Sequence, residues 1–165
     1  MSIPDVGTTA PEIGLPDDTG TIHRLADQRG RWTVVYFYPT DDTPGCTVEA
    51  CEFRDANDEI RERGADVWGI SPQGASSKRE FREKFGLPFV LLADTDHAIA
   101  DAYGTWVEKH NYGKTYMGTA RTTFLVDPEG RIARTWSKVK PEGHPAEVIV
   151  ALDEARAQFA APATT

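Results

Sequence analysis

The sequence predicts a single α/β domain in which helices flank a mixed central sheet. Three observations support this fold class: the chain has 165 residues, strand-like runs alternate with helical ones, and a β-hairpin pattern comes late in the chain. Alternation of strands and helices is typical of a layered α/β fold, and the late hairpin makes the sheet mixed. No repeat or linker divides the chain, so we expect one domain over residues 1–165, with a frayed tail after about residue 160.

The predicted strands are runs rich in β-branched and aromatic residues. They begin with two weak strands around Ile13 and Ile22 and continue with 33–38, 65–70, 89–93, 119–126 and 131–137. The run 33–38 is continuously apolar, as expected of a strand that is covered on both faces. The last two runs flank a four-residue turn, 127–130, which predicts the hairpin.

Segments with helical periodicity separate these strands and close the chain. They are 44–63, 77–85, 97–103 and 145–159. The first ends at Gly64, and the second begins with the capping-box pattern Ser77 to Glu80 and stops at Gly86. Pro145 suits the first position of the last helix.

Composition and charge limit the classes of partner. The net charge is −8, which argues against nucleic acid or an anionic membrane as the main partner. No apolar run approaches the length of a membrane span, and the first residues show neither the basic nor the apolar region of a signal peptide. We therefore expect a cytoplasmic protein, in a compartment where thiols are kept reduced.

The two cysteines, Cys46 and Cys51, are the candidates for chemistry. In a reducing compartment such a pair points to metal binding, catalysis or redox sensing. A structural zinc site needs four ligands, and the four histidines are scattered, so we expect no metal. A thioredoxin-type oxidoreductase would use Cys-x-x-Cys, whereas the spacing here is Cys-x4-Cys. Two idle core cysteines remain an alternative.

The residues before Cys46 predict a helix start. Thr43 suits the N-cap and Pro44 the first helical position, which makes Cys46 the third helical residue. Free N–H groups and the positive end of the helix dipole favour a thiolate there. The nearby carboxylates of Asp41, Asp42 and Glu49 oppose this effect. A cation from elsewhere in the chain must then help, and the residues alone do not identify it.

The spacing of the cysteines suits a switch better than a permanent crosslink. Five residues along an ideal helix separate the two Cα atoms by roughly 8 to 9 Å, whereas a disulfide needs Cα atoms within about 7 Å. A disulfide between Cys46 and Cys51 would therefore require the first turn or two of the helix to unwind.

The motif Pro39-x-x-x-Thr43-x-x-Cys46 resembles the active-site motif of the peroxiredoxins. The longer segment 36–54 is similar to the bacterioferritin comigratory protein, or PrxQ, group, and the likeness covers nearly the whole chain. The resemblance implies a thioredoxin-like fold with an N-terminal β extension and an inserted helix. It also implies a thiol-dependent peroxidase that reduces hydrogen peroxide and organic hydroperoxides without a cofactor, is recycled by thioredoxin or a similar dithiol, and acts as a monomer.

The resemblance further implies roles for individual residues. Cys46 matches the peroxidatic cysteine, which becomes a sulfenic acid, and Cys51 the resolving cysteine, which forms the Cys46–Cys51 disulfide. Thr43 and Arg121 match the residues that position the peroxide and stabilise the thiolate. Pro39 matches the residue that shields the thiolate, and Glu49 matches a member of the active-site hydrogen-bond network. Without the resemblance, the residue pattern predicts only that Thr43 is an N-cap and that Arg121 is a surface arginine. A redox-responsive binding protein switched by the same disulfide is the alternative function.

Overall fold

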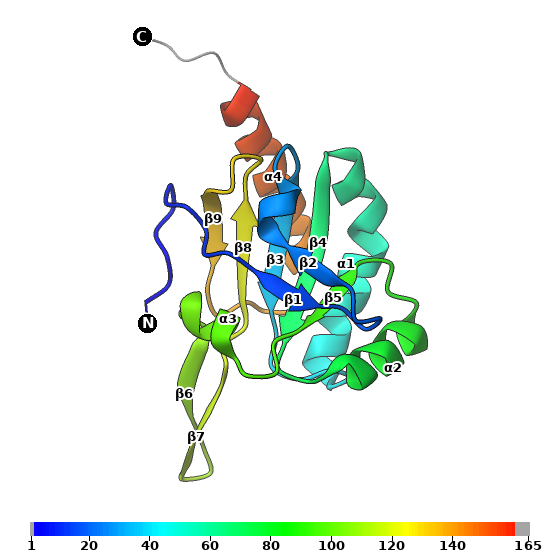
Figure 1. Cartoon of the computed structure of the whole chain (residues 1–165), viewed down its shortest axis with the longest axis vertical. Helices are drawn as coiled ribbons and strands as arrows, with labels where there is room; N and C mark the ends of the chain where they lie inside the picture. The colour runs from blue at the N-terminus through cyan, green and yellow to red at the C-terminus, as the bar shows by residue number, and fades with distance from the viewer. Residues whose placement is uncertain (1, 161–165) are drawn as a thin grey trace.

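A five-stranded mixed sheet lies at the centre of the fold. The computed structural model describes residues 2–160, and the predicted frayed tail lies outside the described residues. Within this part the strand order is β5-β4-β3-β8-β9 (Figure 1). The strands are β3 (Trp32–Phe37), β4 (Ala65–Ser71), β5 (Val90–Ala93), β8 (Thr122–Val126) and β9 (Ile132–Trp136). Strands β3, β4 and β5 run parallel, β8 runs antiparallel to β3, and β9 runs antiparallel to β8, so the predicted mixed sheet is confirmed.

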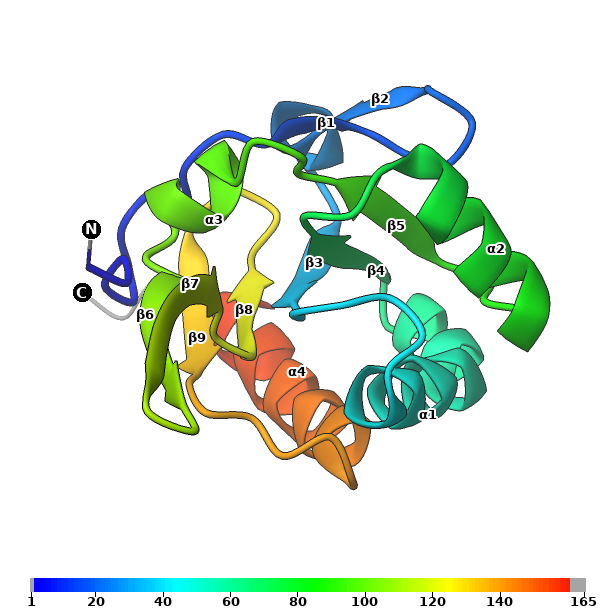
Figure 2. The same ribbon diagram turned by 90° about the horizontal axis from the view of Figure 1, so that it is seen from below.

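Helices cover both faces of this sheet, as the view along it shows (Figure 2). The helices are α1 (Pro44–Glu62), α2 (Ala75–Phe85), α3 (Ala98–Ala102) and α4 (His144–Ala160), with a short 3-10 helix η1 (Leu25–Gln28). Helices α1 and α4 pack together on one face, and α3 lies with the N-terminal segment on the other. α2 follows β4 and packs beside the edge strand β5, in the place of the expected inserted helix.

Strand β3 is buried along its whole length, as its apolar run predicts. Because side chains alternate across a strand, β3 supplies both cores. Val34 and Tyr36 belong to the core under α1 and α4, whereas Val35 and Phe37 belong to the core on the opposite face. The predicted N-terminal extension is confirmed as an antiparallel pair of β1 (Gly14–Pro16) and β2 (Ile22–Arg24).

The structure corrects the predicted strand 119–126. A separate hairpin of β6 (Trp106–Asn111) and β7 (Lys114–Thr119) precedes β8, and Ala120 and Arg121 interrupt the chain between β7 and β8. The backbone N–H of Ala120 donates to the carbonyl oxygen of Thr105 (2.7 Å), so the chain turns out of the sheet there. The hairpin was missed because its strands are mostly polar and its turn, Tyr112–Gly113, is not an Asn-Gly or Asp-Gly pair.

The predicted capping box at Ser77 is wrong. Helix α2 begins two residues earlier, at Ala75. Its N-cap is Gly74, which has no side chain that could form a capping hydrogen bond. Ser77 lies inside the first turn, and its hydroxyl donates to the carboxylate of Asp41 instead (2.8 Å). The predicted stop at Gly86 is confirmed, because this residue adopts the left-handed conformation (φ 61°) that glycine tolerates. None of the helices within residues 2–160 is both long and apolar enough to span a bilayer.

Candidate active site

Cys46 lies at the carboxyl end of β3, where the chain turns into α1. It is the third residue of α1, as predicted, and Thr43 occupies the N-cap position with extended backbone angles (φ −96°, ψ 158°). The predicted capping bond of the Thr43 side chain is wrong, because its hydroxyl donates back to the carbonyl oxygen of Thr40 (3.0 Å). The first N–H groups of α1 therefore receive no bond from Thr43.

Arg121 brings a positive charge to the sulfur of Cys46. Its Nη2 atom donates to Sγ of Cys46 at 3.4 Å, and its Nη1 atom donates to Oε1 of Glu49 at 2.8 Å. Arg121 sits in the break between β7 and β8, and its side chain is 17% exposed. The structure thus supplies the cation that the helix start lacks on its own and brings Cys46, Glu49 and Arg121 together.

Gly45 makes room for this guanidinium. A Cβ atom at position 45 would lie 3.2 Å from Nη2 of Arg121 and 3.7 Å from Cγ of Pro141. A distance of 3.2 Å is shorter than an ordinary van der Waals contact, so a side chain at this position would require Arg121 to shift by a few tenths of an ångström. Glycine at 45 therefore favours the close approach of Arg121 to Cys46.

Glu49 is fully buried beneath Arg121. Burial raises the pKa of Glu49 to about 7, although the charge and hydrogen bond of Arg121 act in the opposite direction. Its second oxygen, Oε2, has no hydrogen-bond partner among the described residues. Glu49 therefore changes charge near neutral pH, directly beside the group that contacts Cys46.

The acidic residues that we expected to oppose a thiolate are all paired. The pairs are Asp41 with Lys78, Asp42 with Lys84, and Glu49 with Arg121. A nearby cation offsets the field of a carboxylate. The expected electrostatic opposition around Cys46 is thus largely neutralised.

Both cysteines are free thiols on one unbroken helix. Cys46 is buried, with 1% of its surface exposed, and Cys51 is half-buried. On an ideal helix their Cα atoms are roughly 8 to 9 Å apart, which is too far for a disulfide. The structure is therefore that of the dithiol state, with the peroxidatic candidate closed off from solvent but in contact with Arg121.

Pro39 is the second residue after β3 and is half-buried. Its carbonyl oxygen accepts a hydrogen bond from Nε2 of Gln73 (3.1 Å), and Oε1 of Gln73 accepts one from the backbone N–H of Asp41 (3.0 Å). The loop between β3 and α1 is thereby attached to the loop after β4.

Two lysines near the site were not anticipated from the sequence. Lys109 lies on β6, and its pKa is lowered first by burial and then by the charge of Arg121, whereas Cys46 acts in the opposite direction. Lys78 is completely buried on α2 and pairs with Asp41. Its signal was present: Lys78 shares a helical stripe with Phe81 and Phe85, three and seven positions later.

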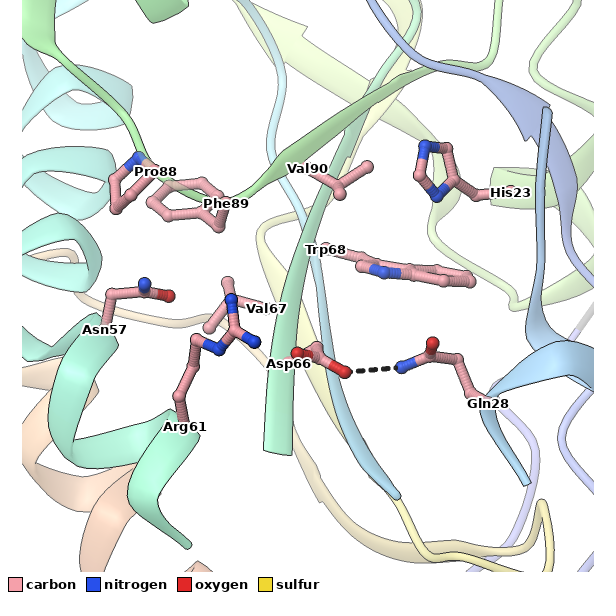
Figure 3. A pocket seen from close by; sticks show the side chains of 10 residues that line it. All are labelled: His23, Gln28, Asn57, Arg61, Asp66, Val67, Trp68, Pro88, Phe89 and Val90. Atoms are coloured by element: carbon pink, nitrogen blue, oxygen red, sulfur yellow. Dashed lines mark hydrogen bonds between the residues drawn. The ribbon is translucent and has the colours of Figure 1, made fainter. Parts of the chain in front are cut away.

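A pocket lies at the opposite end of the sheet from Cys46. This pocket, of about 240 Å³, is lined by Asn57 and Arg61 of α1 and by Trp68 and Phe89, and contains neither cysteine (Figure 3). Nε2 of Gln28 donates to Asp66 at its rim (3.0 Å). Residues 2–160 contain no group of three or more His, Cys, Asp or Glu side chains placed to hold a metal ion.

A mixed sheet flanked by helices, with a cysteine at a helix start and an arginine against its sulfur, is the arrangement expected of a thiol-dependent peroxidase. Comparison with known proteins agrees: residues 6–135 match the model of the AhpC/TSA family, and the chain belongs to this family. It is 45% identical over 150 residues to the peroxiredoxin Bcp of Bacillus subtilis, covering 91% of this chain and 96% of that protein. The peroxiredoxin Bcp of Escherichia coli is 44% identical over 138 residues, or 84% of this chain and 88% of that one.

Solved structures point to the same group. The bacterioferritin comigratory protein of Xanthomonas campestris, described for its alkyl peroxide reduction activity, has a TM-score of 0.85 and 37% identity, and the match covers 91% of this chain and 98% of that one. A structure of peroxiredoxin Q from the same organism has a TM-score of 0.82 and 39% identity over 86% of this chain and 90% of that one. The chain is therefore a peroxidase of the oxidoreductase class, similar to the Bcp and PrxQ peroxiredoxins.

Proposed function

We propose that the chain reduces hydrogen peroxide and organic hydroperoxides through Cys46, with Cys51 as the resolving cysteine and thioredoxin or a similar dithiol as the reductant. The observation that carries this proposal is the contact between Nη2 of Arg121 and Sγ of Cys46 (3.4 Å) at the start of α1. The alkyl peroxide activity described for the Xanthomonas relative supports the inclusion of organic hydroperoxides. The scheme needs no metal or organic cofactor.

In the first step the thiolate of Cys46 attacks one peroxide oxygen. A sulfur–oxygen bond forms, the oxygen–oxygen bond breaks, and the second oxygen leaves as an alcohol or water after taking up a proton. Cys46 is thereby oxidised to a sulfenic acid. Cys51 then attacks this sulfur, hydroxide leaves as water, and a disulfide remains. A dithiol reductant reopens the disulfide by exchange through a mixed disulfide.

Ionisation of the thiol explains only part of the rate. A free cysteine with a pKa of about 8.5 is already a few per cent thiolate at neutral pH, so complete ionisation gains only about thirty-fold. The remainder must come from stabilising the negative charge that develops on the leaving oxygen. Arg121, the hydroxyl of Thr43 and the free N–H groups at the start of α1 are the available donors, and removal of one such donor can cost roughly 3 to 4 kcal/mol.

Thr43, Pro39 and Glu49 have supporting roles in this scheme. The hydroxyl of Thr43, now bonded to Thr40, turns towards the bound peroxide, and Pro39 shields the thiolate from water. Glu49 holds the guanidinium of Arg121 through its 2.8 Å ion pair, which leaves Nη2 directed at Cys46. Arg121 touches the reacting sulfur, whereas Glu49 acts through Arg121 as a positioning residue.

The disulfide step requires part of α1 to unwind. Gly45 lowers the cost of this change, because glycine is a poor helix former, by about 1 kcal/mol relative to alanine. The half-buried position of Cys51 in the second turn means that its release disturbs less packing than release of a core side chain. The same disulfide would also serve a redox-responsive binding protein, but the family and its named relatives favour the peroxidase.

The two cysteine variants test the proposal directly. Cys46→Ser should abolish peroxide consumption with any reductant. Cys51→Ser should still consume one equivalent of peroxide per protein but lose thioredoxin-driven turnover. The measurement is peroxide consumption, followed with and without thioredoxin. Full turnover by Cys51→Ser with thioredoxin as the sole reductant would exclude the two-cysteine scheme.

We propose further that the protein works in the cytoplasm and acts as a monomer. A reducing compartment keeps the dithiol reductant available and the two cysteines in the reduced state. Light scattering after size-exclusion chromatography should give a mass near the 18.2 kDa of one chain. A dimer in both redox states would overturn the monomer assignment without affecting the chemistry of Cys46.

A further inference from the structure

Two consecutive aspartates in the loop before Cys46 are paired with two lysines of α2. Asp41 pairs with Lys78 and Asp42 with Lys84. The pairs differ in burial: the side chains of Lys78 and Asp41 are 0% and 2% exposed, those of Lys84 and Asp42 59% and 42%. An exposed ion pair contributes little to stability, whereas a buried pair cannot be broken without leaving a charge unpaired in the interior.

The carboxylate of Asp41 lies at the centre of a buried network. Nζ of Lys78 lies 3.4 Å from both of its oxygens and also donates to the hydroxyl of Ser71. The hydroxyl of Tyr38 donates to Oδ1 of Asp41, and that of Ser77 to Oδ2. Asp41 is thus tied to β4 and α2 through its side chain.

Within residues 2–160, Lys78 forms an ion pair with Asp41 and with no second carboxylate. The carboxylate of Asp94 also acts on its charge, but Asp94 accepts hydrogen bonds from the backbone N–H groups of Ile99 and Ala100 and so is committed to the start of α3. Among the described residues, Asp41 is its ion-pair partner. Release of Asp41 would therefore leave Lys78 buried without its counter-charge, and burial, which already lowers its pKa to about 8, would favour loss of its proton.

This network stands immediately before the part of the chain that must unwind. Asp41 lies five residues before Cys46 and three before the first residue of α1, Pro44. The proposed disulfide requires the turns that carry Cys46 and Cys51 to open. Because breaking the buried pair is costly, the loop at Asp41 resists an opening that the turns after it must undergo.

We propose that Lys78 is a positioning residue of the peroxidase: through Asp41 it holds the loop before Cys46 in the folded site and sets the point at which unwinding of α1 stops. This inference rests on the function proposed above. Loss of the anchor should leave the folded site less populated, which slows attack on peroxide. It should also free the loop, which lets Cys51 reach the sulfenic acid sooner.

The test follows both steps separately in the full chain. Reduced protein is mixed with hydrogen peroxide, quenched at intervals and measured by intact mass, which distinguishes thiol, sulfenic acid and disulfide. For Lys78→Met we expect peroxide attack to slow about fivefold or more, because the unpaired Asp41 loosens the loop. We expect disulfide formation to accelerate about threefold or more, because local opening becomes easier.

Lys84→Met is the matched control, since it breaks the exposed pair between the same loop and the same helix. In this variant the rates of peroxide attack and of disulfide formation should both stay within about twofold of the wild-type rates. Hydrogen exchange gives a second measurement: amides of residues 44–51 should exchange faster in reduced Lys78→Met than in wild type or Lys84→Met.

The double variant Asp41→Asn/Lys78→Met keeps the inference testable if the single variant does not fold. It removes both charges and so leaves none unpaired, but it still removes the anchor. We expect it to fold and to show slower attack with faster disulfide formation. Wild-type rates in the double variant, or equal slowing of both steps in Lys78→Met, would overturn the role of Lys78. Failure of wild type to form sulfenic acid at all would instead overturn the proposed function.

Discussion

Nη2 of Arg121 lies 3.4 Å from Sγ of Cys46, although the two residues are 75 positions apart in the chain. The sheet produces this contact, because β8, which begins just after Arg121, pairs with β3, which ends just before the loop to Cys46. The contact depends on Gly45, which leaves space for the guanidinium, and on Glu49, which holds its other nitrogen. Each of these dependences can be tested.

Substitution of Arg121 should slow the peroxide step without preventing folding. In Arg121→Gln the donor to the developing charge is lost, and we expect a loss of about 100-fold to 1000-fold in the second-order rate constant of Cys46 oxidation. Arg121→Lys should fall between this variant and wild type, because lysine keeps the charge but cannot form two parallel contacts. Rapid quenching with hydrogen peroxide measures both. Arg61→Gln, an exposed arginine at the far end of α1, is the control and should react as wild type does.

Gly45→Ala should slow both chemical steps. The added methyl group lies 3.2 Å from Nη2 of Arg121 and displaces it, so we expect attack on peroxide to slow by about tenfold, equivalent to about 1.4 kcal/mol. Alanine also stabilises the helix by about 1 kcal/mol, which should slow unwinding and disulfide formation. A Gly45→Ala enzyme with wild-type rates would show that Arg121 can move without cost.

Glu49 should make the stability of the protein depend on pH below neutrality. Its pKa is raised from 4.5 to about 7 by burial, so the folded protein retains a proton that the unfolded chain loses. The contribution of this proton to stability is fully present below pH 4.5 and is lost as the pH rises through 7. The difference between the folded and unfolded pKa values corresponds to a loss of about 3 kcal/mol in the free energy of unfolding.

Glu49→Gln should abolish this dependence, because glutamine resembles the protonated acid. Relative to wild type, we expect the variant to gain stability between pH 4.5 and 7 and to be more stable above this range, as measured by urea unfolding. A constant difference between the two proteins across this range would contradict the pKa of Glu49.

Protonation of His144 should lower the stability of the folded protein in acid. Burial lowers its pKa from 6.5 to about 4, and its Nε2 atom lies 2.8 Å from Oγ1 of Thr123. The unfolded chain takes up a proton below pH 6.5, whereas the folded protein does so only below about 4. Stability is therefore lost as the pH falls through this range, by up to about 3 kcal/mol. His144→Gln should lose less stability than wild type between pH 6.5 and 4, and equal losses in urea unfolding would contradict this role.

The local features around Cys46 could be predicted because they depend on neighbouring residues. A β-prone apolar run, an N-cap residue and a proline at the first helical position define the end of β3 and the start of α1. The choice of Arg121 could not be made from residue patterns alone, since it depends on the pairing of β8 with β3. Resemblance to the peroxiredoxins identified it, and the structure places it against the sulfur.

The anchor at Lys78 was missed for a different reason. Ser77 and Glu80 satisfy the local capping pattern of a helix start, which predicts an exposed polar position for Lys78. The stripe that Lys78 shares with Phe81 and Phe85 indicates a buried face but does not identify a partner for the charge. Burial of its charge becomes favourable only when Asp41, held by Tyr38 in the loop after β3, and Ser71 at the end of β4 converge on it. Such tertiary compensation leaves no trace in local propensity.

The unbroken course of α1 through both cysteines bears on how a reductant would leave the enzyme. In the proposed cycle the dithiol form has a regular helix over residues 44–51, and the disulfide form cannot keep it. A reductant that docks on the opened segment would lose its own binding surface as soon as the helix closes again. Release of the spent reductant would then follow from refolding of the enzyme, and reduced enzyme would not compete with oxidised enzyme for the next reductant molecule.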